Sequence, residues 1–232
     1  MNLSILGLVK YIFFLCMLCV AQNINRSFLL MLYEEKFTEN CPQCGDALAI
    51  HFKYTKLIKC HSCKSTIFLE DDSVKLIGKS AVLSPEPSLI KLHKTFKFQN
   101  RRFTPLGKIR YSYGRGFWEE WFLQDENGKP FWLSIDEGDF VLEEKINFSL
   151  PFKKNREFKV GQYLNDYQIT EIGEGVCVGF EGELPEAIKL NETHQYVHLS
   201  RGNGELLTLE FAENETMTFK GQWIDPLAIE VL

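Results

Sequence analysis

Four cysteines near the N-terminal end constrain the fold of this 232-residue chain more than any other feature. They occur as CPQC at 41–44 and, after fifteen intervening residues, as CHSC at 60–63, which is a spacing typical of zinc ribbons. A tetrahedral Zn²⁺ site needs four ligands, and each close pair can present both sulfurs from one tight turn. Gly45, directly after the first pair, lets the backbone turn beneath the ion. The spacing therefore predicts a zinc ion bound by Cys41, Cys44, Cys60 and Cys63.

Four thiolates leave no coordination position for water or substrate, so we expect a structural zinc rather than a catalytic one. The residues between the two pairs are predicted to form a β-hairpin over 47–59, with strands at 49–52 and 57–59. Two disulfides, or four thiols that bind no metal, are the alternatives for the same spacing. His51 and His61 are expected at the surface, because four cysteines already complete the coordination shell.

Residues 1–36 form an apolar leader, in which Leu3 to Ala21 carries a single charge at Lys10. Three interpretations stay open: a cleaved signal peptide, a single-span membrane anchor, and a mis-assigned start with the true start at Met31. The anchor has roughly the 20 residues that a span requires, but Lys10 lies nearly midway along it. Export would expose the cysteines to oxidation. We therefore expect a cytoplasmic protein, or one anchored in the inner membrane with its domains facing the cytoplasm.

The rest of the chain is predicted to be mainly β. Short apolar and aromatic runs between Phe103 and Leu142 are bounded by turn signals, with Asn127-Gly128 as one hairpin turn and 136–138 as a second. A looser copy of this pattern recurs from Tyr167 to Leu207. We predict a ribbon over 37–72, a linker over 73–87 that contains two prolines, and β units over 88–150 and 151–232. Each unit is too small to close its own core, so the fold class is an antiparallel β domain of two related sub-units, packed as a sandwich or as paired half-barrels.

The charge pattern bears on nucleic-acid binding, which is the alternative function. Eight basic residues alternate with aromatic residues between 91 and 115, and this pattern occurs in single-strand binders. It is also typical of a strand whose aromatic residues face inward while its charges face water, and Glu119 and Glu120 follow at once. Residues 151–232 carry seven basic and fourteen acidic residues, which disfavours contact with phosphates there. We therefore expect no nucleic-acid partner.

The sequence shows no catalytic constellation. His194 and His198 lie in a predicted strand, where four residues separate them by roughly 13 Å, so one ion cannot join them. Cys177 is a lone thiol with apolar neighbours on both sides, which is typical of a buried small side chain. Glu119 and Glu120 are adjacent in a strand and point to opposite faces, so they cannot act as an acid and base pair. An uncharacterised enzyme stays the less favoured class.

Several motifs together resemble a known family. In order, they are CPQCG at 41–45, WEEW at 118–121, WL at 132–133, GELP at 182–185 and GQW at 221–223. Over residues 37–232 the chain is similar to the bacterial family called domain of unknown function 4178, often found with an N-terminal zinc ribbon. The resemblance implies an all-β domain and a connection with membrane-stress and membrane-remodelling systems, and it assigns no catalytic residue. The apolar N-terminus departs from the family pattern, in which the ribbon lies close to the starting Met, and this supports Met31 as the start.

These observations together predict a non-catalytic zinc-ribbon β-domain protein. We expect it to act as a binding or scaffold module for a protein partner or a membrane-associated complex.

Overall fold

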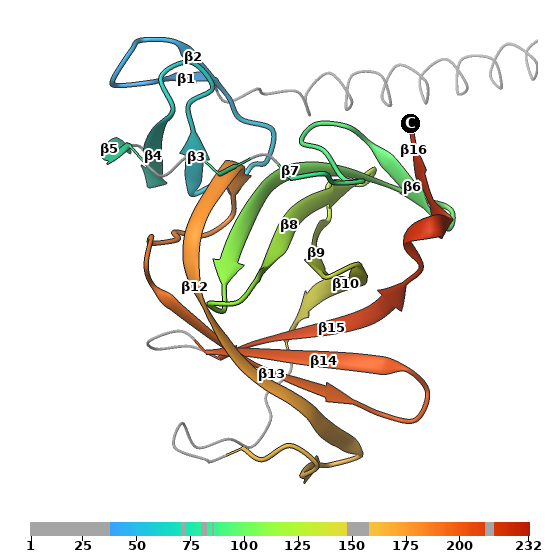
Figure 1. The fold of residues 1–232 in the computed structure, drawn as a ribbon. Helices are drawn as coiled ribbons and strands as arrows, with labels where there is room; N and C mark the ends of the chain where they lie inside the picture. The colour runs from blue at the N-terminus through green and yellow to red at the C-terminus, as the bar shows by residue number, and fades with distance from the viewer. Residues whose placement is uncertain (1–37, 71–72, 80–82, 85, 148–157, 212–215) are drawn as a thin grey trace, which may run out of the picture. The chain divides into compact units, whose positions relative to one another are not determined.

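The computed structural model of the chain describes residues 38–70, 73–79, 83–84, 86–147, 158–211 and 216–232 (Figure 1). As predicted, the fold is mainly β: the described regular structure consists of antiparallel strands and one short 3-10 helix, Pro226–Ala228. The apolar stretch from Leu3 to Ala21 lies outside the described residues. Within the described ranges, no helix is long and apolar enough to cross a membrane.

The first five strands form what we call the ribbon unit: β1 (Thr38–Asn40), β2 (Ala47–Ala49), β3 (Leu57–Lys59), β4 (Ser65–Glu70) and β5 (Ser73–Lys79). The predicted hairpin over 47–59 is wrong, because β2 pairs with β1, and β3 pairs with β4. The physical reason is that the turn at each cysteine pair joins the two strands that flank it. β5 also pairs with β4, so strand structure continues into the segment that we assigned to the linker.

The remaining strands are β6 (Phe96–Phe98), β7 (Arg101–Ser112), β8 (Phe117–Asp125), β9 (Pro130–Asp136), β10 (Asp139–Ile146), β11 (Tyr163–Leu164), β12 (Tyr167–Leu184), β13 (Thr193–Ser200), β14 (Glu205–Phe211), β15 (Thr216–Ile224) and β16 (Ile229–Val231). Eight of them form a ring. Pairing runs from β7 through β8, β9, β10, β15, β14 and β13 to β12, and β12 pairs again with β7. In Figure 1, β12 extends from these strands to the ribbon unit.

The two predicted sub-units contribute equally to the ring. β7–β10 come from residues 88–150, and β12–β15 come from residues 151–232. The two runs pair at both edges, β7 with β12 and β10 with β15, and this gives one continuous sheet. The division into two related sub-units therefore stays a prediction.

Local turn chemistry is as the sequence indicated. Gly128 has a φ of +81°, and it lies in the turn between β8 and β9. Glu137 and Gly138, with φ of +47° and +100°, join β9 to β10. Positive φ at both central residues matches the twist of a tight antiparallel hairpin.

Apolar residues pack on both faces of the ring strands. One cluster joins Trp121, Leu123 and Leu133 to β6 and β16. A second joins Ile109, Tyr111, Trp118, Phe122 and Cys177 to Phe52 and Leu57 of the ribbon unit. The ribbon unit thus packs its own apolar side chains against residues of the ring.

Candidate metal centre

Each cysteine pair lies on a tight turn between two strands. After the first pair, the Gly45 amide donates to the Cys41 carbonyl at 2.8 Å, and after the second pair the Lys64 amide donates to the Cys60 carbonyl at 3.0 Å. Gly45 and Lys64 occupy equivalent positions, with φ of +77° and +61°. The glycine avoids the steric penalty that a side chain meets in this region, while Lys64 adopts the conformation despite it. The two turns therefore have the same geometry although only one contains glycine.

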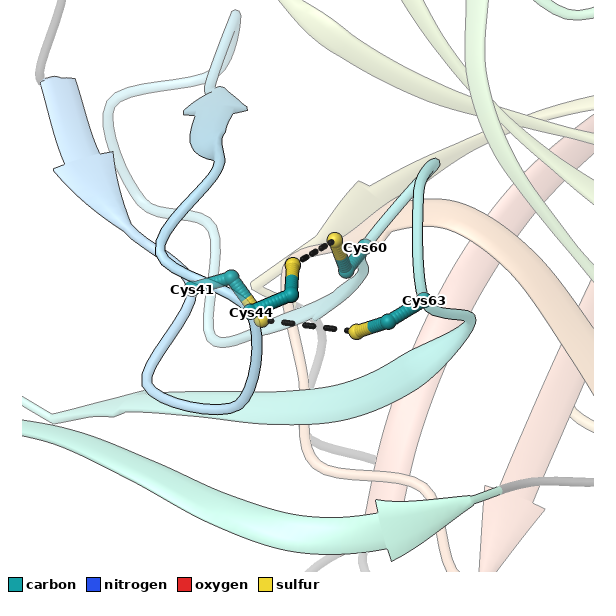
Figure 2. A group of neighbouring side chains, drawn as sticks. All are labelled: Cys41, Cys44, Cys60 and Cys63. Carbon is teal, nitrogen blue, oxygen red and sulfur yellow. Dashed lines mark hydrogen bonds between the residues drawn. The ribbon is translucent and has the colours of Figure 1, made fainter.

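The four sulfur atoms form a compact cluster (Figure 2). All four Sγ atoms lie within 4.8 Å of one another. Cys41 Sγ is 3.6 Å from Cys63 Sγ, and Cys44 Sγ is 3.7 Å from Cys60 Sγ. Zn–S bonds of about 2.3 Å in a tetrahedron place neighbouring sulfurs about 3.8 Å apart. The cluster therefore has the dimensions to hold a metal ion such as zinc.

The described cysteines are all free thiols. The sulfur separations in the cluster are far longer than the roughly 2.05 Å of a disulfide. Cys41 and Cys60 are buried, whereas Cys44 is exposed. The arrangement does not match the disulfide alternative, and it matches a shared ion.

Hydrogen bonds favour the thiolate form of one cysteine in the cluster, Cys63. The Ser65 side chain lies 3.2 Å from Cys63 Sγ, and with the Ser65 backbone amide it lowers the pKa of Cys63 to about 6. At Cys44 the Asp46 backbone amide acts to lower the pKa, but burial and the three neighbouring thiols raise it to about 12. Since thiolates are the metal ligands, a cation must displace protons from this cluster, and its affinity should fall as the pH falls.

A single carboxylate joins the ribbon unit to the ring. Glu183 lies near the end of β12, and it is 1% exposed. Its carboxylate accepts hydrogen bonds from the backbone amides of His51 and Phe52 and from the Thr55 hydroxyl, at 2.8 to 3.1 Å. His51 Nδ1 lies 2.7 Å from Glu183 Oε1. Neither the GELP motif nor the ribbon spacing indicated this contact, which spans more than 120 residues.

The two histidines near the cysteines have different environments. The His51 side chain is 40% exposed and contacts Glu183, so its position is not purely at the surface. His61 is 70% exposed, as expected, and its Nε2 lies 3.1 Å from Asp46. The described metal-ligand cluster contains the four cysteines and neither histidine.

Of the five side chains weighed for catalysis, Cys177, Glu120, His194 and His198 line two neighbouring pockets, whereas Glu119 does not. Cys177 is buried in an apolar cluster, and burial raises the pKa of its thiol to about 11, which disfavours a nucleophile. Glu119 and Glu120 point to opposite faces, as the strand alternation predicted. Glu119 contacts Lys108 and Arg110, whereas Glu120 lines a pocket with His194. His194 and His198 lie in β13, in agreement with the strand prediction.

The basic stretch differs from its prediction in one respect. Lys108 and Arg110 are 7% and 4% exposed, and so they do not face water. Both donate to Glu119 Oε1, at 3.0 Å from Lys108 Nζ and 2.6 Å from Arg110 Nη2. Trp121 Nε1 donates to the other Glu119 oxygen. Glu119 accepts from both groups across the β7–β8 pair, and Lys108 Nζ also lies 4.0 Å from Glu181, so both basic groups already have acidic partners within the fold.

Comparison with known proteins identifies the family. No curated protein and no solved structure matches the chain. The family described as Domain of unknown function (DUF4178) matches residues 91–226, which include β6 to β15 and exclude the four cysteines. The match covers more than half of the chain and contains the whole ring of strands. On this match, the chain belongs to the DUF4178 family, and it carries a four-cysteine cluster consistent with a zinc ribbon on the N-terminal side of that domain.

Proposed function

We propose that the protein is a non-catalytic binding or scaffold module whose ribbon unit is held together by a structural zinc ion. The observation that carries the proposal is the cluster of four mutually close sulfurs. Four sulfur ligands fill a tetrahedral shell, and bound zinc would supply folding free energy to a unit too small to have a large core. Cys41, Cys44, Cys60 and Cys63 would hold the ion.

The joint at Glu183 supports a scaffold role. It fixes the backbone of the ribbon unit to the ring by several hydrogen bonds to one buried carboxylate. A rigid joint presents the two parts as one surface to a partner. We propose a protein partner or a membrane-associated complex, with two related sub-units in the ring, and a location on the cytoplasmic side where thiols stay reduced. The internal pairing of Lys108 and Arg110 supports this class over nucleic-acid binding.

Metal analysis of the purified full chain tests the zinc site. We expect about one zinc ion per chain. The double variant Cys41→Ser, Cys44→Ser should lose the metal, and Cys177→Ser, which changes a buried thiol outside the cluster, should keep it. Full zinc retention by the double variant would contradict the assignment.

A further inference from the structure

The ring of strands encloses a second candidate site. Two pockets, with volumes of about 130 and 120 Å³, share Glu120, His194 and Glu210 in their walls and are therefore neighbours. Each of the eight ring strands contributes residues to these walls. The contributions alternate along the strands, as in Trp132, Ser134 and Asp136 of β9. Alternation places these side chains on one face of the sheet, so the pockets lie on the inner face of the ring.

The walls of this inner cavity are strongly acidic. Among the described residues they contain eight different Asp or Glu residues, one lysine, Lys189, and two histidines, His194 and His198. The carboxyl groups come from strands on all sides, for example Glu120 from β8, Glu143 from β10 and Glu210 from β14. Such a concentration of one sign of charge attracts cations.

The partners found for the three innermost carboxyl groups are uncharged or weakly basic. Glu120 hydrogen-bonds with Ser134 and Trp118, and Glu143 accepts from the Thr208 hydroxyl. Glu210 lies 3.6 Å from His194 Nε2. Burial lowers the pKa of His194 to about 4, so this imidazole is neutral at neutral pH.

Burial raises the pKa of each of these acids, and repulsion by neighbouring carboxyl groups adds to this at Glu120 and Glu210. For Glu120 the pKa rises to about 8, first because of burial and then because of Glu143. For Glu210 it rises well above the usual value, again chiefly through burial, although Lys145 acts in the opposite direction. The site therefore disfavours the ionised form of these carboxyl groups.

Aromatic side chains form the other part of the wall. The Trp118 ring lies 5.0 Å from the Tyr111 ring and 5.5 Å from the Tyr196 ring. Gly175 makes room for Trp118, because a Cβ there would lie 2.2 Å from the indole. Tyr111 is 4% exposed and lines the cavity. A cavity lined by carboxyl groups and aromatic faces suits a ligand with N–H donors and an apolar stem.

We propose that this inner cavity binds a small primary alkylammonium cation. The ammonium N–H groups would be accepted by Glu120, Glu210 and the Tyr111 hydroxyl, and the alkyl chain would pack against Trp118 and Tyr196. Binding ionises carboxyl groups that are protonated in the free cavity, so protons leave to solvent as the cation enters. The metal-ligand cluster in the described chain comprises the cysteines alone, and this favours an organic cation over a divalent metal ion in the cavity.

Titration calorimetry on the zinc-loaded full chain tests this proposal, with n-butylammonium as the probe and n-butanol as its uncharged counterpart. We expect n-butylammonium to bind with a dissociation constant in about the millimolar range or tighter, and n-butanol not to bind. Measurement in two buffers with different ionisation enthalpies should show proton release. Tetramethylammonium, which lacks N–H donors, should bind more weakly.

Glu210→Gln and Glu120→Gln locate the site. Each should weaken n-butylammonium binding at least about tenfold, because a charge-assisted hydrogen bond is lost. Glu230→Gln, an exchange at an exposed residue of β16, should leave binding unchanged. Thermal unfolding and zinc content are measured for every variant, so that a misfolded variant is recognised. Absence of n-butylammonium binding, binding unaffected by both cavity variants, or binding of Mg²⁺ or Ca²⁺ in its place would each overturn the proposal. Zinc retention is measured separately, so these outcomes leave the scaffold assignment standing.

Discussion

At the scale of single residues, Glu183 shows how one carboxylate can join two parts of a fold. It is 1% exposed, and the amides of His51 and Phe52 and the hydroxyl of Thr55 all point at it. The cysteines could be predicted from the sequence because their spacing is local. Glu183 could not, because its partners are distant in the chain and no spacing rule relates them.

Replacing Glu183 by Ala should therefore destabilise the protein by about 3 kcal/mol or more, because two amides and a hydroxyl lose their acceptor in a buried site. Urea unfolding measures the change. Glu174→Ala is the control on the same strand, since Glu174 is exposed and accepts one side-chain bond, and it should cost less than about 0.5 kcal/mol. Equal effects of the two exchanges would show that the Glu183 joint adds no stability.

Glu120 gives the protein a specific pH dependence. Its pKa rises from 4.5 to about 8 on folding, chiefly through burial. Between these pH values the folded state holds a proton that the unfolded state has lost, so the free energy of unfolding falls as the pH rises through the window. Glu120→Gln is neutral at every pH and should flatten this decline, with a relative gain on the order of 2–4 kcal/mol at about pH 9 compared with about pH 5.

Urea unfolding at a series of pH values checks this expectation. The exposed exchange Glu230→Gln should leave the slope of stability against pH as it is in the wild type. A Glu120→Gln profile that runs parallel to the wild type would show that this carboxyl group is not the source of the decline.

At the scale of elements, turns set by adjacent residues could be predicted from the sequence, whereas pairing between strands distant in the chain could not. The turns at Asn127-Gly128 and at 136–138 formed as expected, because each contains a glycine that adopts positive φ, Gly128 and Gly138. The prediction of a hairpin over 47–59 was wrong, because each cysteine turn joins the two strands that flank it, so that β1 pairs with β2 and β3 pairs with β4. β12 pairs with β11, β13, β7 and β3 along its 18 residues, and no local pattern shows one strand with four partners.

Ring closure depends on a close approach between β7 and β12. Gly182 has a φ of +73°, and a Cβ there would lie 2.2 Å from the Leu106 carbonyl oxygen. Gly182→Ala should cost roughly 3 kcal/mol or more, because it adds a backbone clash to the penalty for positive φ. Gly204→Ala is the matched control: its φ is +78° with open space around it, so it should cost only about 1–2 kcal/mol. Similar losses of stability in urea unfolding would mean that the β7–β12 approach can relax.

At the scale of the whole molecule, the ribbon unit and the ring share apolar contacts but little strand pairing. Phe52 and Leu57 belong to the same cluster as Phe122, and the Phe52 and Phe122 rings lie 5.0 Å apart, edge to face. β3 and β12 pair only through Glu183 with Ile58 and Leu184 with Leu57. The ring, by contrast, closes through its own strands. The metal site and the ring should therefore differ in their response to loss of zinc.

Removal of zinc with a chelator should unfold the ribbon unit first, because the ion is expected to supply on the order of 10 kcal/mol to it. Hydrogen exchange should then show lost protection in β1–β4 and retained protection in β8–β10 and β13–β15, whose pairing is complete without the ribbon unit. Binding of a hydrophobic dye should rise as Phe52 and Leu57 leave the cluster with Phe122. Cys41→Ser with Cys44→Ser should reproduce this state without chelator, and Cys177→Ser should respond to chelator like the wild type. Simultaneous loss of protection in the ribbon unit and the ring would instead show one cooperative unit, in which the contacts of Glu183 and Phe52 transmit loss of the metal to every strand.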